Sequence, residues 1–498
     1  MSLVFLSACT KDFLTYTPEN ALGSEIALTT VVNCEAGAVG LYSMMNSFEY
    51  SGRNLIAIGD LAADNTNTLA ETAGHLADVE KYNLSTSTTD IAKLWANGYR
   101  IISASTKLIV AVDKLIGSTS SKEDIKRLQL TKAQAYGLRA YNYFMLANYF
   151  CLPYSPENAQ TSGLILMNLK AIEVNDPQAN STLQATYDRI FGDIEAAKAA
   201  FEASGTDVVN STKAQFFINK AAVWGLDARF KLFYGNNAGA IESARKAIEF
   251  RTGGKIIYDW KQYLEMWTST DINSEDMFSL TATAADNLSA NSMCSFYAGY
   301  GAQVSKYIKS EILNSKTDMR TQLYPTRDYP KQEFSVLKYP NKNNIVNVPV
   351  IRLPEMYLTI AEAEAKLNGT SQAAFDALFV IAQRDTAVRE NGVMGLQAKY
   401  TNPEELLKAI EIERQRELMC EGHRWMDLRR NHQALTRNGS NGSNKSNDYR
   451  ITFKNWPVYD FAYAIPVAEI NANPFIKQNT TWASGVPNPT LPIQGYGM

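Results

Sequence analysis

The sequence predicts a mainly α-helical protein, in which helix pairs pack into one body that carries an irregular, loop-rich insertion. Apolar residues recur every three or four positions along most of the chain, which is the spacing of helices with one buried face. Small residues recur where two helices would cross closely, whereas residues 251–350 lack the helical pattern. With 498 residues, the chain can bury a large core without disulfides or metals. Length alone would favour about three domains, but the continuous pattern favours a single domain over residues 31–498.

The composition excludes several classes of protein. The chain has 48 basic and 51 acidic residues, a net charge of −3, which argues against a nucleic-acid-binding surface. Charged residues make up 20% and aromatic residues 11%. This balance suits an uncharged ligand, although a large core would also use many aromatic rings. The five cysteines form no CxxC motif or close pair, and none of the three histidines lies in an HExxH motif. We therefore expect no disulfide framework, no metal site and no cofactor.

The N-terminus favours attachment to a membrane through a lipid. Leu6-Ser7-Ala8-Cys9 fits a bacterial lipobox, in which the cysteine is lipidated and becomes the new N-terminus. No Lys or Arg precedes Cys9, and the apolar run is short, so residues 1–8 are interpreted as the remnant of a signal peptide. Residues 9–30 would then form a tether. A chance match in a cytosolic N-terminus is the alternative, and no apolar run is long enough to span a membrane.

The helical pattern predicts eight helices in order along the chain. The first covers 91–115, where Trp95 is expected in the core, and the second covers 122–150 and ends before Pro153. Six further helices are expected at 183–202, 213–234, 237–250, 352–367, 371–389 and 404–430. Asn368-Gly369 is a typical helix C-cap.

Two of the helix pairs resemble the tetratricopeptide motif, which places a large aromatic residue at position 4 and small residues at positions 8 and 20. Trp224, Ala228 and Ala240 fall at these positions in one pair, with Ala247 at position 27. Tyr357, Ala361 and Ala373 fall at them in the other pair, with Ile360 at position 7. Small residues let two antiparallel helices approach closely, while the aromatic ring fills the space above them. The pairs do not form a tandem array, so we expect scattered helix pairs within one solenoid-like body, with Trp224 in its core.

Residues 251–350 form the predicted insertion. They are rich in Asn, Ser, Thr, Gly and Tyr and contain short β-like runs at 336–339 and 346–350. A second polar loop is expected at 436–448. Loops carried by a rigid scaffold are where binding residues concentrate, so the insertion is a candidate for ligand contact.

No catalytic motif is present. The chain contains no GxSxG nucleophile motif, no complete dinucleotide-binding loop and no P-loop. The densest ionisable cluster lies between residues 411 and 430, where Glu413, Glu417 and Glu421 are expected on one helix face. Five arginines nearly neutralise the acids, which is typical of a structural ion-pair network. A glycoside hydrolase, which needs two suitably spaced carboxylates, stays an alternative.

Six ordered segments together resemble the SusD/RagB family of Bacteroidetes outer-membrane lipoproteins. The most specific segment is residues 413–430, with the pattern ERxRELxxEGHRWxDLRR. The other five are Cys9–Leu14, Lys132–Phe144, Tyr187–Ala197, Arg352–Ala363 and Ala464–Asn479. The similarity runs nearly from end to end of the chain.

The resemblance implies a binding lipoprotein that is not an enzyme, exposed at the cell surface and anchored to the outer membrane. Such proteins cover a SusC-like TonB-dependent transporter barrel and deliver oligosaccharides to it; some relatives handle peptides instead. The resemblance also implies that the 413–430 motif is part of the fold and not a ligand site.

Two loop segments match the chemistry of a sugar site, which combines a flat aromatic platform with polar side chains at its rim. The family usually binds its ligand on loops after the early helices and in the central insertion. The candidate ligand residues are Asp64, Asn65, Asn67, Phe296, Tyr297 and Tyr300. Packing of a local loop core is the alternative for each ring, and Trp267 is left open between core and site. Asp60 and Asp64 could instead bind calcium, but their spacing is not that of an EF-hand.

Overall fold

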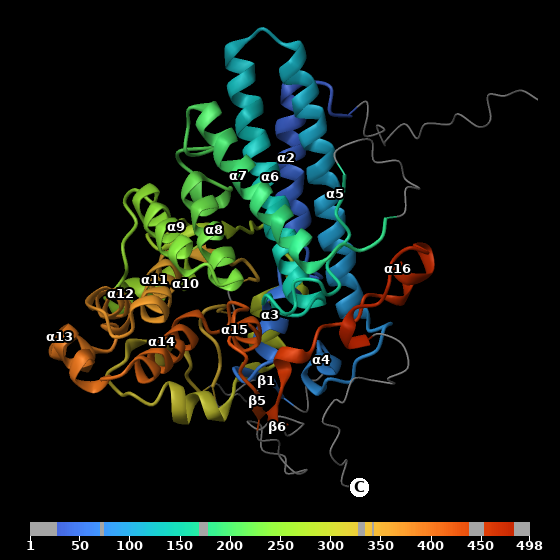
Figure 1. Ribbon diagram of the computed structural model, residues 1–498. Helices are drawn as coiled ribbons and strands as arrows, with labels where there is room; N and C mark the ends of the chain where they lie inside the picture. The colour runs from blue at the N-terminus through green and yellow to red at the C-terminus, as the bar shows by residue number, and fades with distance from the viewer. Residues whose placement is uncertain are drawn as a thin grey trace, which may run out of the picture.

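The computed structural model describes residues 27–69, 74–168, 178–326, 334–340, 343–437 and 453–482. Helices dominate the described chain (Figure 1), and its strands form three two-stranded antiparallel sheets. The predicted mainly helical fold is confirmed. None of the helices in these ranges is both long enough and apolar enough to cross a membrane.

Three helices form the tallest part of the molecule: α2 (Val31–Met45), α5 (Thr89–Ser118) and α6 (Lys122–Phe150) (Figure 1). Every residue of α6 from Ala133 to Phe150 is buried. A helix that is buried on all sides must be surrounded by other elements, and α6 packs against α2, α5, α7 and α8. The Phe144 ring, for example, stacks on Phe230 with centroids 4.3 Å apart.

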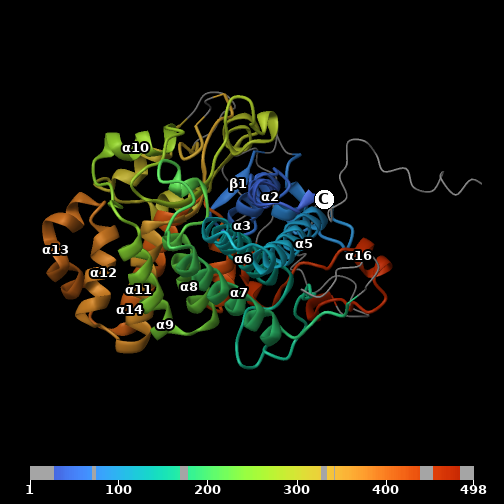
Figure 2. The ribbon, with the colours of Figure 1, turned by 90° about the horizontal axis from the view of Figure 1, so that it is seen from above.

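From α6, the chain continues as a row of packed helices. Figure 2 shows them side by side, and each contacts the next. The row consists of α7 (Leu183–Ser204), α8 (Lys220–Tyr234), α9 (Asn237–Phe250), α11 (Leu353–Asn368) and α12 (Gln372–Ala382). The small residues of the predicted helix pairs, Ala228, Ala240 and Ala361, have no exposed surface. Trp95 is buried as predicted, whereas Trp224 is half-buried with the Lys198 ammonium 3.8 Å from its ring centroid.

Three predicted helices differ from those observed: one begins later in the sequence, and two are each divided into two shorter helices. The 213–234 helix begins at Lys220, where the Asn219 side chain accepts a hydrogen bond from the Ala222 N–H. The 371–389 helix is divided into α12 and α13 (Thr386–Lys399), which is capped by Asp385. The 404–430 helix is divided into α14 (Pro403–Leu418) and α15 (Arg424–Arg430). Between them Gly422 has φ +83°, a value that L-residues rarely adopt.

Residues 251–350 contain short elements joined by irregular segments. They include α10 (Trp260–Thr268), β2 (Asp276–Leu280), β3 (Ala302–Val304) and β4 (Val348–Arg352). β2 pairs with β4, and β3 pairs with β1 (Thr66–Thr68), which follows the short helix α3 (Asn54–Leu61). The β-like run 336–339 forms a turn and not a strand, and the Tyr339 hydroxyl donates a hydrogen bond to the Cys420 carbonyl at 3.0 Å.

The C-terminal part returns to the first helices. β5 (Leu435–Arg437) pairs with β6 (Phe453–Trp456), and most of the predicted polar loop 436–448 lies outside the described residues. The short helices α4 (Ala77–Lys81) and α16 (Val467–Ala472) lie on the same side of the molecule as the lower part of α5 (Figure 1). Trp425 stacks on Tyr149 of α6, with ring centroids 5.3 Å apart.

Candidate functional site

The ionisable cluster is a buried ion-pair network. Arg352 donates to Glu421 at 2.7 Å and to Glu275 at 2.8 Å, and Arg320 donates to Glu413 at 2.6 Å. Burial alone would raise the pKa of Glu417, but Arg384, Arg352 and Arg320 together lower it far below its usual range. Glu421 lies beyond the end of α14, so the predicted shared helix face is wrong for this residue.

The network has no room for a substrate. The cavity that reaches Arg352 has a volume of about 10 Å³. Trp267, which the sequence left open, is buried and packs against the Lys338 and Arg352 cations, at 4.7 Å and 5.0 Å from its ring centroid. Burial lowers the pKa of His423 to about 4, so this ring is neutral at pH 7. The network therefore joins helices and does not hold a ligand.

The predicted ligand residues that directly follow α3, Asp64 and Asn65, are buried. The Asp64 carboxylate accepts two hydrogen bonds from Arg424, at 2.7 Å and 2.8 Å. The Asn65 amide donates to Asp60 at 2.5 Å and accepts from Gln415 at 2.9 Å. These contacts fasten the segment before β1 to α14 and α15. No group of three His, Cys, Asp or Glu side chains in the described ranges is placed to hold a metal ion.

Three more predicted residues are also buried. Asn67, in β1 opposite Gln303, has no exposed surface. Phe296 and Tyr297 are 1% and 0% exposed, and the Tyr297 ring stacks on Tyr339 with an interplanar angle of 7°. These two rings pack inside the molecule, as the loop-core alternative states, and present no platform to a ligand in this conformation.

Tyr300 is the one predicted ligand residue whose ring reaches the surface. It is half-exposed and lies against the half-exposed His75, with ring centroids 4.1 Å apart. Burial and the Arg53 cation lower the pKa of His75, whereas the Asp90 carboxylate raises it. The ring pair therefore has one cation and one carboxylate close by.

Arg53 offers a hydrogen-bond donor beside this ring pair. Its guanidinium lies over the Phe48 ring, 4.9 Å from the centroid, and its Nε donates to Asn54 at 2.9 Å. Within the described part of the chain, its Nη1 has no hydrogen-bond partner although it is buried. Asn54 in turn donates to Asp90 at 3.1 Å, which fixes this polar cluster.

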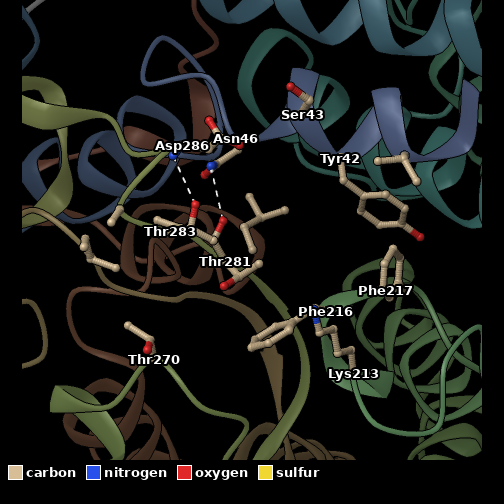
Figure 3. A pocket seen from close by; sticks show the side chains of 15 residues that line it. Tyr42, Ser43, Asn46, Lys213, Phe216, Phe217, Thr270, Thr281, Thr283 and Asp286 are labelled. Atoms are coloured by element: carbon tan, nitrogen blue, oxygen red, sulfur yellow. Dashed lines mark hydrogen bonds between the residues drawn. The ribbon is translucent and has the colours of Figure 1, made fainter. Parts of the chain in front are cut away.

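A separate cavity has a volume of about 580 Å³ (Figure 3). Tyr42, Ser43 and Asn46 of α2 line one side. Phe216 and Phe217, on the short turn before α8, line another. The remaining wall is made chiefly by Thr281, Ala282, Thr283, Ala284 and Asp286. Asn46 donates to the Thr281 carbonyl at 3.4 Å, and the Thr283 hydroxyl accepts from the Asp286 N–H at 3.1 Å.

The cavity and the Tyr300–His75 ring pair are joined by short chain segments. A β-carbon at Gly52 would lie 2.3 Å from the Asn46 carbonyl oxygen and 2.7 Å from the Leu288 side chain, so Gly52, which precedes Arg53, contacts the cavity residue Asn46 directly. The Ser295 hydroxyl donates at 2.7 Å to Asn344, the neighbour of the cavity residue Ile345. Tyr300 and His75 do not line the cavity themselves. We treat the cavity and the ring pair as one candidate site and call it the 580 Å³ site.

Sequence reasoning missed most of this site. Phe216 and Phe217 fell within the predicted helix 213–234, but the observed helix α8 begins at Lys220, about two turns later. A signal was present: Asn219 is a strong N-cap residue, and a helix that begins after it leaves the two aromatic residues before it on a loop.

Comparison with known proteins identifies the family. Residues 227–482 match the SusD family, and residues 12–232 match a family described as starch-binding and associating with the outer membrane. No curated protein matches the chain.

Solved structures show the same fold. A SusD superfamily protein from Bacteroides thetaiotaomicron is 24% identical with a TM-score of 0.77, over 90% of this chain and 99% of that one. A protein from Bacteroides vulgatus, described as sugar binding, is 22% identical with a TM-score of 0.80, over 92% of this chain and 100% of that one. Because the match covers more than half of the sequence and the fold agrees over nine tenths of it, the chain belongs to the SusD family.

Proposed function

We propose that this protein binds oligosaccharides at the 580 Å³ site. The observation that carries the proposal is the cavity itself, which is lined both by the rings of Phe216 and Phe217 and by the polar side chains of Ser43 and Asn46. Sugars present apolar ring faces and polar edges, so a site for them needs both kinds of group. The volume lies within the range of about 300–1,000 Å³ that is usual for small-ligand pockets.

The parts of the site have different roles. Phe216 and the half-buried Tyr300 would pack against sugar rings, while Ser43 and Asn46 would form hydrogen bonds with hydroxyl groups. Lys213 and Asp286 are the charged residues that line the cavity, and their charges cancel. A neutral ligand fits this balance, and its binding would depend little on salt.

The bound sugar would leave chemically unchanged. Hydrolysis of a glycosidic bond normally uses two carboxyl groups that flank the bond. Of the described residues that line the cavity, Asp286 carries the one carboxylate. The description of the matching family as starch-binding and the name of the Bacteroides vulgatus structure support capture of a glycan rather than its cleavage.

The proposed cellular role is delivery of the captured glycan to a transporter. Cys9, which lies outside the described residues, would carry a lipid that anchors the protein to the cell-surface side of the outer membrane. A SusC-like TonB-dependent barrel would receive the oligosaccharide. The outer-membrane association in the description of the matching family supports this location.

Binding to arrays of neutral glycans and of peptides tests the proposal. We expect retention of a neutral glycan with no release of reducing ends. Phe216→Ala and Tyr300→Ala should each lower the affinity for that glycan, whereas Phe475→Ala, which truncates an exposed ring elsewhere, should not. Binding to peptides alone, or release of reducing ends, would contradict the proposal.

A further inference from the structure

A second cavity, with a volume of about 630 Å³, lies at the other end of the β1–β3 strand pair. In this pair Thr68 opposes Ala302 and Thr66 opposes Val304. Tyr300 lies just before the Ala302 end, whereas Asp64 and Ser305 adjoin the opposite end and line the second cavity. Residues of α15 and β5 complete it, near the β1 and β5 labels of Figure 1. The two cavities have no lining residue in common.

Tyr307 places an exposed aromatic ring at this second cavity. It is 42% exposed, and Phe475 is the one other aromatic residue of the described ranges whose exposure is comparable. Burial of part of the ring and the Asp64 carboxylate both raise the pKa of Tyr307, which places the ring beside the cavity wall. An exposed ring at a cavity wall offers a flat apolar face against which a ligand with an apolar face of its own can pack.

The cavity wall holds a fixed cation. Arg424 uses Nε and Nη2 for its two hydrogen bonds to Asp64. Its Nη1 has no hydrogen-bond partner in the described ranges, and its side chain is 11% exposed. Asp64 is also held by Gln415 at 3.3 Å, and the Ser305 hydroxyl donates to the Asp64 carbonyl at 2.8 Å. The guanidinium is thus oriented before any ligand arrives.

Positive charge exceeds negative charge around this cavity. Four cationic side chains line it against the two carboxylates Asp64 and Glu311, a difference of +2. The cations are Lys306, Lys408, Arg424 and Arg437. Lys306 is exposed and has no ion-pair partner among the described residues, whereas Lys408 lies 3.4 Å from Glu411. The 580 Å³ site, by contrast, is lined by one Lys and one Asp.

We propose that the 630 Å³ cavity binds an acidic sugar, with Tyr307 packed against the sugar ring and its carboxylate held by Lys306 and the Nη1 group of Arg424. A carboxylate suits a guanidinium that already has a fixed orientation. An acidic peptide would depend on the cations but not on the Tyr307 ring. The effect of removing this ring on binding therefore distinguishes an acidic sugar from an acidic peptide. The proposal does not depend on the function proposed for the 580 Å³ site.

Titration of the soluble protein with tetragalacturonate tests this inference, with the methyl ester of the same oligomer as the uncharged probe. We expect tetragalacturonate to bind and the ester to bind at least about tenfold more weakly, which corresponds to about 1.4 kcal/mol. Tyr307→Ala and Lys306→Gln should each weaken tetragalacturonate binding about tenfold. Higher salt should weaken it too, because the attraction is between charges. Phe475→Ala is the control for loss of an exposed ring, and all three positions are exposed, so folding should be preserved.

Three results would overturn the inference. The first is no binding of tetragalacturonate, and the second is binding that Tyr307→Ala and Lys306→Gln leave unchanged. The third is equally strong binding of hexaglutamate with no effect of Tyr307→Ala, which would show attraction to charge alone. Tyr300→Ala should leave tetragalacturonate binding intact while it weakens retention of a neutral glycan. Failure at one cavity can therefore be told from failure at the other.

Discussion

The backbones of Gly59 and Gly422 lie in direct contact, although 363 positions separate them in the sequence. A β-carbon at Gly59 would lie 2.2 Å from the Gly422 carbonyl oxygen. Beside this contact the Asp60 carboxylate accepts hydrogen bonds from the N–H groups of Gly422, at 2.7 Å, and Cys420, at 3.2 Å. The end of α3 is thereby held against the turn between α14 and α15. This contact supports the segment that leads into β1 and that supplies Asp64 to the 630 Å³ cavity.

Gly59→Ala should destabilise the protein by at least about 2 kcal/mol, because the added methyl group would meet backbone atoms that cannot rotate away. The free energy of unfolding in urea measures the loss. Gly192→Ala in α7 is the matched control: its β-carbon would meet no atom within 4 Å, so alanine there should be neutral or stabilise the helix by up to about 1 kcal/mol. Equal stability of the two variants would contradict this account of the contact.

Glu355→Gln should show a loss of stability that depends on pH. Burial alone would raise the pKa of Glu355, but Arg229, His423 and Arg414 outweigh it and hold the pKa at about 2. A carboxyl whose pKa is lowered by folding stabilises the protein above its unfolded pKa of about 4.3, and this contribution is lost as the pH falls toward 2. We therefore expect wild type to exceed the variant by about 3 kcal/mol at pH 7 and by about half as much at pH 3.

Urea unfolding of both proteins from pH 7 to pH 3 measures this difference. Other groups contribute to the pH dependence of both proteins, and taking the difference between the two removes their contribution. Asp60 is an example: burial raises its pKa to about 6, so the protein loses stability as the pH rises through that value. Glu390→Gln, an exposed residue of α13, should give no such dependence. A gap between wild type and E355Q that stays constant over this range would show that Glu355 does not act through its charge.

The sequence predicts this fold well where the cause of structure is local. The helix 122–150 was predicted with the observed bounds, because its apolar spacing ends just before Pro153. The helix 404–430 was not, because its break depends on contacts from α3. Gly422 reduces helix formation by a modest amount on its own, but Asp60 supplies the hydrogen bonds that stabilise the turn. The local spacing of apolar residues does not predict hydrogen bonds between positions so far apart in the sequence.

The candidate site was predicted less well for the same reason. Asp64 and Asn65 follow a short helix and have the polarity of a surface loop, yet Arg424 and Gln415 cover them. Phe296 and Tyr297 were correctly placed in the insertion, but their burial depends on Tyr339 and its neighbours. Residue type therefore indicated the correct segment. The tertiary packing determines which ring of that segment is accessible, and residue type does not predict it.

Cys9→Ala should release the protein from the membrane fraction, because the proposed anchor is the lipid on that cysteine. Cell fractionation and metabolic labelling with a radioactive fatty acid measure the change. The buried Cys34→Ala variant is the control for loss of a thiol, and it should remain in the membrane. Cys9 lies outside the described residues, so the lipid anchor stays a prediction. If Cys9→Ala stays membrane-bound in cells that lack the partner barrel, the lipid anchor is wrong.

Tyr297→Ala and Tyr300→Ala should have opposite effects, although the two residues are three positions apart. Tyr297 is fully buried against Tyr339, so its truncation should cost about 3 to 5 kcal/mol of stability. Tyr300 is half-exposed and contacts His75, so its truncation should cost less than about 1 kcal/mol but reduce the affinity for a neutral glycan about tenfold. Thermal unfolding and glycan titration, run on both variants, separate the two effects. If Tyr300→Ala lost stability as Tyr297→Ala does while binding at full affinity, Tyr300 would be a packing residue and the 580 Å³ site would not include it.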